Sequence, residues 1–461
     1  MIMKERANFG SKFGVIMASA GSAVGLGNIW RFPSETGNNG GGAFIFVYII
    51  CVLLLGMPIM VSEFIIGRHS RANTASAYRI LAPKTHWHWI GRLGVLTGFL
   101  ILSYYSVVAG WTLDYAIASA TNRFNTMYVA GGPTAFKSYF DSFVADPFRP
   151  VLYLVLFLLI THIVIVKGVE KGIERFSNIF MPILFILLLF LMICSLTMPG
   201  ASAGLRFIFQ PDFSKITSNV VLSAMGQAFF SLSLGMGCLC TYASYFNKET
   251  KLGKTALSVG IIDTCVAVMA GVIIFPAVFS VGGNVDEGPS LLFVALPNIF
   301  HSVFGSMPIL AYTFSLMFYF LLVLATLTST ISMHEVVTAY LSESFHLSRK
   351  KAASMVTGGS IFLGLFCSLS MGILNGYQLF GMNLFSLFDF VTAKLMLPIG
   401  GFLIAVFTGW FLNRNIVRAE MTNDGLQKFP LFPAFFFMLR FIVPIGIALV
   451  FLNELGFIGF L

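Results

Sequence analysis

The stretch GSAVGLGNIWRFP, residues 21–33, interrupts the first long apolar segment of the chain. It places three glycines, an asparagine and an arginine where a helix that only crosses a bilayer would carry apolar side chains. Glycine weakens a helix, and asparagine adds a side-chain oxygen. The stretch therefore predicts a membrane helix that is broken in its middle.

The composition is typical of a protein that crosses the membrane many times. Of the 461 residues, 57% are hydrophobic and 10% are charged, whereas soluble domains carry about 25% charged residues. Eleven apolar segments are long enough to cross a bilayer as helices, namely 12–33, 41–67, 91–119, 150–167, 176–198, 219–245, 256–281, 305–341, 352–371, 378–411 and 431–459. We therefore predict an all-α polytopic membrane protein.

Lysine and arginine are distributed unevenly between the two sets of loops. Twenty of the 28 lie on the side of the N-terminus, six lie on the opposite side, and Lys394 and Arg440 lie within spans. Because cytoplasmic loops are enriched in these residues, we expect a cytoplasmic N-terminus and an outside C-terminus in the cell (inner) membrane. The excess of lysine and arginine in cytoplasmic loops also explains the net charge of +9. The charge therefore does not indicate nucleic-acid binding, and we expect the lipid bilayer as the partner.

The sixth apolar segment contains a second interruption, GQAFFSLSLGMGCLC at residues 226–240. A unit of five spans is odd, so a copy of it must be inserted upside down. Glycine-interrupted spans at matching positions of inverted halves indicate the central site of a transporter. We predict a single transporter domain over 1–461, with a five-helix repeat over 12–198, its inverted copy over 219–411 and an additional helix over 431–459.

A broken helix has a specific chemical use in a membrane. Unwound backbone is tolerated there only where it lines a cavity or is buried in protein. Its N–H groups can hold an anion, and its carbonyl groups can hold a cation. Close packing through small residues is the alternative for the first span alone, but the matching break in the sixth span favours a binding site.

Hydroxyl groups follow one face of the eighth span, VLATLTSTISMHEVV at residues 323–337. Ala325, Thr328, Ser329, Ser332 and Met333 share this face at helical spacing. Adjacent hydroxyls and backbone carbonyls offer about five neutral oxygens, which suit a monovalent cation better than Ca²⁺ or Zn²⁺. The alternative is that these hydroxyls bond back to their own helix.

Four carboxylates lie within the predicted spans: Glu63, Asp263, Glu335 and Asp389. Such groups are costly in lipid and indicate function by default. Arg31 lies on the outer side of the first break and Asp389 near the outer end of span 10, so an ion pair between them would close the site from outside. For Glu63 and Glu335 we favour structural pairing inside the bundle.

The segments GSAVGLGNIWRFP, NGGGAF, GQAFFSLSLGMG and TYASY resemble the neurotransmitter:sodium symporter family. The resemblance covers essentially the whole chain, and the eleven spans are similar to those of bacterial members that transport hydrophobic amino acids. It implies a Na⁺-coupled symporter, not an enzyme, that imports hydrophobic and aromatic L-amino acids by alternating access. A single chain would suffice as the functional unit.

The resemblance also implies two Na⁺ sites. The first combines the substrate carboxylate with Ala23, Asn28, Ser231 and Asp263, and the second consists of Gly21, Val24, Ala325, Thr328 and Ser329. The family usually has Asn where this chain has Asp263, and often Thr where it has Ser231.

The substrate site implied by the resemblance is largely apolar. It consists of Ala23, Leu26, Gly27, Ile101, Tyr105, Phe230, Ser231, Ser233, Met236, Ser329 and Met333. Amine transporters of the family have Asp where this chain has Gly25, so the glycine favours an α-amino acid.

The family also has gates on both sides of the site. The outer gate would consist of Arg31, Asp389, Tyr105 and Phe230, and the inner gate of Arg6, Phe9, Ser244, Tyr245 and Glu343. Gly172 and Pro182 match a family pattern for unwinding the inner end of span 5.

Chloride-dependent members hold Cl⁻ at positions that match Tyr48, Gln227, Ser231, Asp263 and Ala267. Ala267 lacks the hydroxyl that those members carry, and the Asp263 carboxylate would repel a second anion. We therefore expect Na⁺ and no chloride as the coupling ion. A carboxylate that takes up a proton when Na⁺ leaves would also permit H⁺ countertransport.

Three other functions were weighed against transport. His334 and Glu335 form half of a zinc-protease motif, but Thr338 stands where its second histidine would be, so an enzyme is not expected. A passive channel needs no separate outer and inner gates. A non-transporting amino acid sensor or receptor on the same fold is the main alternative, and uptake into sealed vesicles distinguishes it from a transporter.

Overall fold

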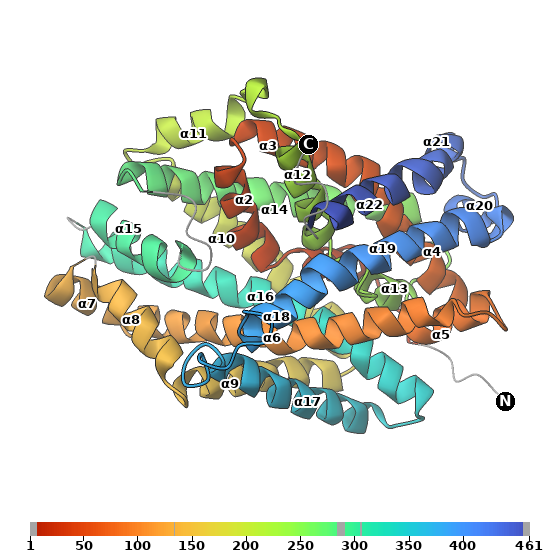
Figure 1. Ribbon diagram of the computed structural model, residues 1–461, viewed down its shortest axis with the longest axis horizontal. Helices are drawn as coiled ribbons and strands as arrows, with labels where there is room; N and C mark the ends of the chain where they lie inside the picture. Colours follow the sequence, from red (N-terminus) through yellow and green to blue (C-terminus); the bar gives the residue numbers. More distant parts are fainter. Residues whose placement is uncertain (1–6, 133, 284–290, 305–306, 455–461) are drawn as a thin grey trace.

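Long apolar helices dominate the computed structural model, which describes residues 7–132, 134–283, 291–304 and 307–454 (Figure 1). Nine of the described helices are long and apolar enough to cross a membrane. Their α-helical segments are α3 and α4 (Gly42–Cys51, Met57–Ser70), α6 (His88–Ala120), α9 (Arg149–Val166), α10 (Arg175–Ser195), α14 (Leu252–Ser280), α16 (Pro308–Ser344), α17 (Arg349–Leu369), α18 and α19 (Leu384–Asp389, Leu397–Val406), and α21 and α22 (Phe432–Phe437, Val443–Glu454). The described ranges contain no strand beyond an isolated bridge between Leu379 and Met382. The all-α prediction is confirmed.

The first span is broken where the sequence predicts it. Helix α1 (Lys12–Ala23) ends at Val24, whose backbone is extended, and the π-helical turn Gly27–Arg31 leads into α2 (Phe32–Asn38). The two halves are bent by 54°. The predicted interruption is therefore a change of helix direction over about one turn.

The sixth span is broken as well. Helix α12 (Ser218–Ser231) and helix α13 (Cys238–Ala243) flank an irregular segment in which Ser233, Gly235 and Gly237 have positive φ angles of 54°, 85° and 78°. A side chain at Gly235 would place its Cβ 2.7 Å from the Leu397 carbonyl oxygen, so this close approach to α19 requires glycine. We count α12, the irregular segment and α13 as the sixth span.

The two broken spans run in opposite directions beside each other. Helix α1 packs against α13, and the π-helical turn that follows the first break packs against α12. The first half of each span thus faces the second half of the other. This antiparallel arrangement is the one that the predicted inverted repeat requires.

Short helices gather at the two ends of the long ones (Figure 1). At one end lie α7 (Arg123–Gly131), α8 (Thr134–Ala145), α11 (Ala201–Phe209) and α15 (Leu296–Val303). At the other end lie α5 (Thr74–Leu81) and α20 (Arg414–Thr422).

Two predicted boundaries are wrong. The helix of span 10 begins at Leu384 and not at 378, because Asn383 caps it by accepting a hydrogen bond from the Ser386 amide at 2.8 Å, and Gly381 before it has a φ of 76°. Span 5 begins at Val169 and not at 176, because the turn Val169–Glu174 is wound as a π-helix that continues into α10.

Candidate functional site

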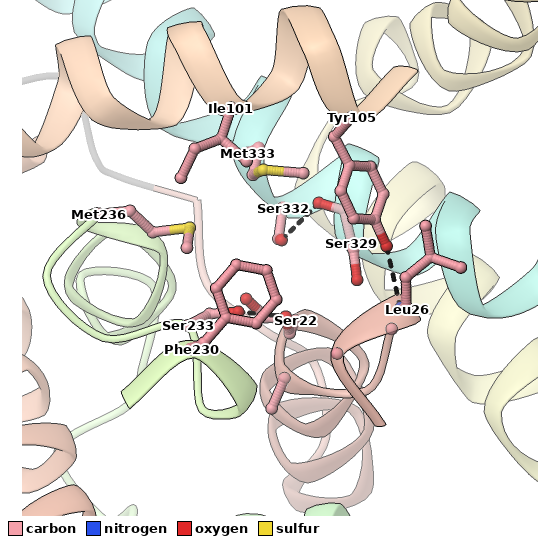
Figure 2. A pocket seen from close by; sticks show the side chains of 13 residues that line it. Ser22, Leu26, Ile101, Tyr105, Phe230, Ser233, Met236, Ser329, Ser332 and Met333 are labelled. Carbon is pink, nitrogen blue, oxygen red and sulfur yellow. Dashed lines mark hydrogen bonds between the residues drawn. The ribbon is translucent and has the colours of Figure 1, made fainter. Parts of the chain in front are cut away.

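A buried cavity of about 30 Å³ lies between the two breaks, α6 and α16 (Figure 2). It is lined by Ser22, Ala23, Gly25, Leu26, Gly27, Ile101, Tyr105, Phe230, Ser233, Met236, Ser329, Ser332 and Met333. Ten of the eleven residues predicted to bind substrate are in this lining, and Ser231 is the exception. Ser22, Gly25 and Ser332 line the cavity without having been predicted as part of the substrate site.

The backbone groups freed by the first break have side-chain partners around the cavity. The Leu26 amide donates to the Tyr105 hydroxyl at 3.2 Å, and the Gly25 amide donates to Asn28 Oδ1 at 3.0 Å. Ser233 Oγ donates to the Ser22 carbonyl at 2.9 Å, so the second break contacts the first (Figure 2). The unwound backbone is thus held in place by protein groups, as a low-dielectric site requires.

The Glu63 carboxylate holds the second break. This fully buried side chain on α4 accepts hydrogen bonds from the Gly235 amide at 2.8 Å and the Cys240 amide at 3.1 Å. It therefore provides hydrogen-bond acceptors for backbone amides on both sides of Gly237, whose backbone is left-handed. The pairing inside the bundle that the sequence favours for Glu63 is thus formed, with backbone amides as partners.

Glycine 25 is required by the cavity. A Cβ at this position would lie 2.4 Å from Ser329 Oγ and 3.0 Å from the Tyr105 hydroxyl. A larger residue would therefore enter the cavity and displace both hydroxyl groups.

Four of the five residues predicted for the second cation site are joined by hydrogen bonds around the first break. Thr328 Oγ1 donates to the Ala325 carbonyl at 2.9 Å and lies 3.3 Å from the Val24 carbonyl oxygen, which also accepts from Ser329 Oγ at 3.2 Å. Gly21 adjoins them, because a Cβ there would lie 3.4 Å from Thr328 Cβ. Carbonyl and hydroxyl oxygens of two spans thus converge where the sequence predicts a cation.

The residues predicted for the first cation site surround the Asn28 amide. Its Nδ2 lies 2.7 Å from Asp263 Oδ1, 3.1 Å from the Asp263 carbonyl oxygen and 3.1 Å from Ser231 Oγ. Ser231 Oγ and the Tyr48 hydroxyl each donate to the Asp263 carboxylate at 3.0 Å. The structure therefore brings Asn28, Ser231 and Asp263 together in a fully buried polar cluster.

Tyr105, Phe230 and Leu26 separate the central cavity from a second one. This cavity, which we call the outer vestibule because it lies on the side predicted to face outward, has a volume of about 330 Å³. It is also lined by Trp30, Arg31, Ser34, Glu35, Tyr104, Val108, Phe385, Asp389, Ala393 and Lys394. The guanidinium carbon of Arg31 lies 4.6 Å from the centre of the Phe230 ring. Tyr105 and Phe230 thus lie where the sequence predicts the outer lid.

The expected ion pair between Arg31 and Asp389 is not formed. Arg31 pairs instead with Glu35 at 3.8 Å, and Asp389 accepts a hydrogen bond from the Tyr104 hydroxyl at 3.0 Å. Both charges line the outer vestibule, so the four residues of the predicted gate are neighbours. A closed outer gate made by this pair stays a prediction for another conformation.

The inner side of the cavity is covered by the segment that precedes α1. The Phe9 amide donates to the Tyr245 carbonyl at 3.0 Å, and the Phe9 ring meets the Tyr242 and Tyr245 rings edge to face at 6.0 and 6.1 Å. Ser244 Oγ donates to the Thr241 carbonyl of its own helix.

Glu343 accepts hydrogen bonds from the backbone amide and from the side chain of Asn73, each at 2.9 Å. Arg6 lies outside the described residues, so its predicted pairing with Glu343 stays a prediction.

The Glu174 carboxylate, which the sequence did not indicate, binds the segment that precedes α1. Glu174 accepts hydrogen bonds from the Gly10 amide at 2.7 Å, the Ser11 amide at 3.0 Å and the Ser11 hydroxyl at 2.8 Å. Glu174 ends the π-helical turn that contains Gly172. That turn is wound in this structure and Pro182 lies inside α10, so the unwinding predicted for Gly172 and Pro182 concerns another state.

Arg68 makes a second unforeseen connection on this side. It lies at the end of α4 and donates five hydrogen bonds: to the Glu420 carboxylate and carbonyl, the Lys248 and Thr250 carbonyls and the Asn423 side chain. Its side chain is only 4% exposed. Span 2 and the loop between spans 6 and 7 are thereby joined to α20, which connects spans 10 and 11. The sequence offered only a positive charge in a loop as a signal.

Glu335 is paired in the same region. Its carboxylate accepts from the Tyr245 hydroxyl at 2.7 Å and forms a salt bridge with Arg349 at 2.5 Å. This pairing inside the bundle is the one that the sequence favours for Glu335.

Two interrupted helices around a central cavity, with oxygen clusters at the breaks, define an ion-coupled membrane transporter. The chain belongs to the sodium:neurotransmitter symporter family, whose model matches residues 6–128 and 143–457. The family is one of transporters and not of enzymes. The resemblance stated from the sequence is confirmed.

Relatives and a solved structure agree with this assignment. An uncharacterized sodium-dependent transporter of Bacillus subtilis (strain 168), YhdH, is 39% identical over the whole of both chains. An uncharacterized sodium-dependent transporter of Haemophilus influenzae is 33% identical over 98% of this chain and 99% of its own. The crystal structure of MhsT in complex with L-phenylalanine is similar with a TM-score of 0.87 and 42% identity, over 98% of this chain and all of MhsT.

Proposed function

We propose that the protein is a Na⁺-coupled symporter that imports hydrophobic and aromatic L-amino acids by alternating access, without chloride. The observation that carries the proposal is the placement of two oxygen clusters at the same helix break that lines the central cavity. Cation and substrate would therefore share one set of backbone atoms. The similarity to MhsT, whose structure contains L-phenylalanine, supports an amino acid as the substrate.

The substrate carboxylate would bind at the break in the first span. The amides near Leu26 and Gly27 and the Tyr105 hydroxyl offer donors there. The side chain would extend between Ile101, Phe230, Met236 and Met333. Methionine side chains are flexible and polarizable, so we expect this small cavity to enlarge for several bulky apolar side chains.

Two Na⁺ ions would bind beside the substrate. The Asn28 NH₂ group now donates to oxygens of Asp263 and Ser231. The first ion would replace these hydrogen bonds and bind between those oxygens and Asn28 Oδ1, which requires the Asn28 side chain to turn and to release the Gly25 amide. The second ion would bind among the oxygens of Val24, Ala325, Thr328 and Ser329, with the Gly21 carbonyl completing the set. These are hard, mostly neutral ligands that suit a monovalent cation.

Movement of spans 1, 2, 6 and 7 against the others would expose the site alternately. A covered inner side and an outer vestibule that ends at Phe230 support a conformation closed toward the N-terminal side. We place that side in the cytoplasm of a cell with an inner membrane, because the excess of lysine and arginine lies there. A single chain encloses the cavity and would suffice for transport.

Purified protein in sealed liposomes tests the function. At ~100 mV each charge contributes about 2.3 kcal/mol and a tenfold Na⁺ gradient adds about 1.4 kcal/mol, so two ions supply roughly 7 kcal/mol, enough for about 10⁵-fold accumulation. We expect labelled leucine, phenylalanine or tryptophan to accumulate only with an inward Na⁺ gradient. Binding without accumulation would instead indicate the sensor, and equal uptake without Na⁺ would exclude coupling.

Tyr105→Phe should weaken substrate binding by roughly 10-fold or more. The change removes the hydroxyl beside the Leu26 amide, and a hydrogen bond to a charged group contributes about 1.5–3 kcal/mol. Binding of labelled substrate at saturating Na⁺ measures the effect. Tyr115→Phe is the matched control, because Tyr115 lies on the same helix and its buried hydroxyl has no hydrogen-bond partner among the described residues. Equal affinity of wild type and Tyr105→Phe would contradict the assignment.

A further inference from the structure

Three arginines surround one pair of stacked rings where span 10 is connected to span 11. Phe432 and Phe436 lie with their centroids 5.7 Å apart at an interplanar angle of 21°. The guanidinium carbon of Arg414 lies 5.6 and 5.1 Å from the two ring centres, that of Arg418 lies 5.9 Å from Phe432, and that of Arg440 lies 4.8 Å from Phe436. We call these five side chains the arginine–phenylalanine cluster.

Among the residues that the structure describes, the positive charges of this cluster have no acidic partner. Within the described ranges, none of the three arginines forms an ion pair with a carboxylate within 4.0 Å. Glu420, the acidic residue of α20, is engaged by Arg68 and His69. Like charges that share two rings repel one another, and the ring faces offset this repulsion only in part. Much of the positive charge of the cluster is therefore not balanced by the rings.

Arg440 places the cluster at the edge of the membrane. It lies within span 11, where its Nε donates to the Gly409 carbonyl at 2.5 Å, while Trp410 Nε1 donates back to the Arg440 carbonyl at 3.0 Å. A Cβ at Gly409 would lie 3.3 Å from Arg440 Cγ, so a small residue is needed for this contact. Long cationic side chains near the ends of membrane helices extend to the headgroup region.

The surroundings of the cluster are apolar and exposed. Trp410 is 56% exposed and meets the partly exposed Phe441 at 5.5 Å, and Phe437 is 56% exposed next to it. Exposed aromatic side chains of this kind are typical of the interface between lipid headgroups and acyl chains. The ligand therefore needs an anionic part and an apolar part.

We propose that the arginine–phenylalanine cluster binds the phosphodiester headgroup of an anionic phospholipid, whose acyl chains lie along Trp410, Phe437 and Phe441. A guanidinium group stacked on a ring keeps its N–H edge available and can bind phosphate with two parallel hydrogen bonds. Basic groups between membrane helices on the cytoplasmic side recognise such headgroups. The site is separate from the central cavity and does not depend on the proposed transport function.

Lipid retention by the full chain tests the proposal. The purified protein is titrated in micelles with phosphatidylglycerol, phosphatidylcholine or glycerol 3-phosphate, and bound lipid is measured by native mass spectrometry. Each arginine near a membrane surface strengthens binding about fivefold, so Arg414→Gln with Arg418→Gln should weaken phosphatidylglycerol binding roughly 25-fold. Both side chains are exposed, and the variant should unfold thermally like wild type in the absence of lipid.

Two controls make the result specific. Arg123→Gln removes another exposed, ring-stacked arginine, 4.9 Å from the Tyr139 ring at the opposite end of the molecule, and should leave lipid binding unchanged. Arg414→Lys with Arg418→Lys keeps both charges but removes the paired N–H groups, so it should bind the lipid more tightly than the glutamine variant and more weakly than wild type. The proposal is overturned if the glutamine variant binds phosphatidylglycerol like wild type, if both pairs of substitutions lose it equally, if phosphatidylcholine binds as tightly, or if glycerol 3-phosphate displaces the lipid at equal concentration.

Discussion

Asp263→Asn combined with Ala267→Ser should make transport dependent on chloride. The Asp263 carboxylate lies 2.7 Å from the Asn28 side chain and is fully buried, so it would supply the negative charge beside the first Na⁺. Loss of one partner of a buried charge pair costs about 3–5 kcal/mol, which corresponds to about 10²–10⁴-fold weaker Na⁺ binding. Ala267 is buried one turn further along α14, and a serine there offers a donor to Cl⁻, whose charge replaces the lost carboxylate.

Uptake into liposomes with chloride or gluconate on both sides measures this change. Wild type should transport equally well in both, and the double variant should be active in chloride alone. Asp263→Asn by itself is the control, because it removes the charge without providing the new hydroxyl, and should be weakly active in both salts. Wild-type transport that stops in gluconate would show that Asp263 does not have this role.

Thr328→Ala combined with Ser329→Ala should abolish Na⁺-driven uptake. Both hydroxyls face the Val24 carbonyl at the first break, at 3.3 and 3.2 Å, and would be two of the five ligands of the second Na⁺. Loss of one such polar partner at a buried site costs about 1–3 kcal/mol, so the pair should weaken Na⁺ binding roughly 30-fold or more. Coupling is lost because the substrate then binds and leaves without this ion.

The Na⁺ dependence of substrate binding and of uptake measures the effect of these two changes. Thr326→Ala provides the matched control on the same helix, since Thr326 Oγ1 bonds to the Leu322 carbonyl of α16 and is as deeply buried. That variant should keep its Na⁺ dependence. Unchanged, Na⁺-dependent accumulation by the Thr328 and Ser329 double variant would refute the second site.

The helix breaks could be predicted from the sequence because they have local causes. Gly25 and Gly27 in the first span leave room for side chains packed against the break, and Gly235 and Gly237 in the sixth have a left-handed backbone. Spacing along α16 likewise placed Thr328 and Ser329 on one face, and the family resemblance connected these elements. The residues around the central cavity could be named for this reason.

Pairings between distant segments could not be predicted in the same way. The predicted ion pair between Arg31 and Asp389 rests on their similar depth in the membrane. Depth does not specify the direction in which a side chain leaves its helix, and each of the two residues has another partner in the structure. Arg68 and Glu420 are 352 positions apart in sequence, and Glu174 meets Gly10 across 164 positions. Neither pair has a sequence signal beyond charge, because only the packed bundle brings them together.

The Arg68 connection has a consequence for leakage of ions. If spans 1, 2, 6 and 7 move as proposed, opening of the inner side would move span 2 away from α20 and separate a nearly buried guanidinium group from the Glu420 carboxylate and from backbone carbonyls. Hydrogen bonds to charged groups contribute about 1.5–3 kcal/mol each, so a protein without bound ligands would then rarely visit the open form. Na⁺ would have little opportunity to cross the membrane without an amino acid, and an idle carrier would not dissipate the electrochemical gradient of the cell.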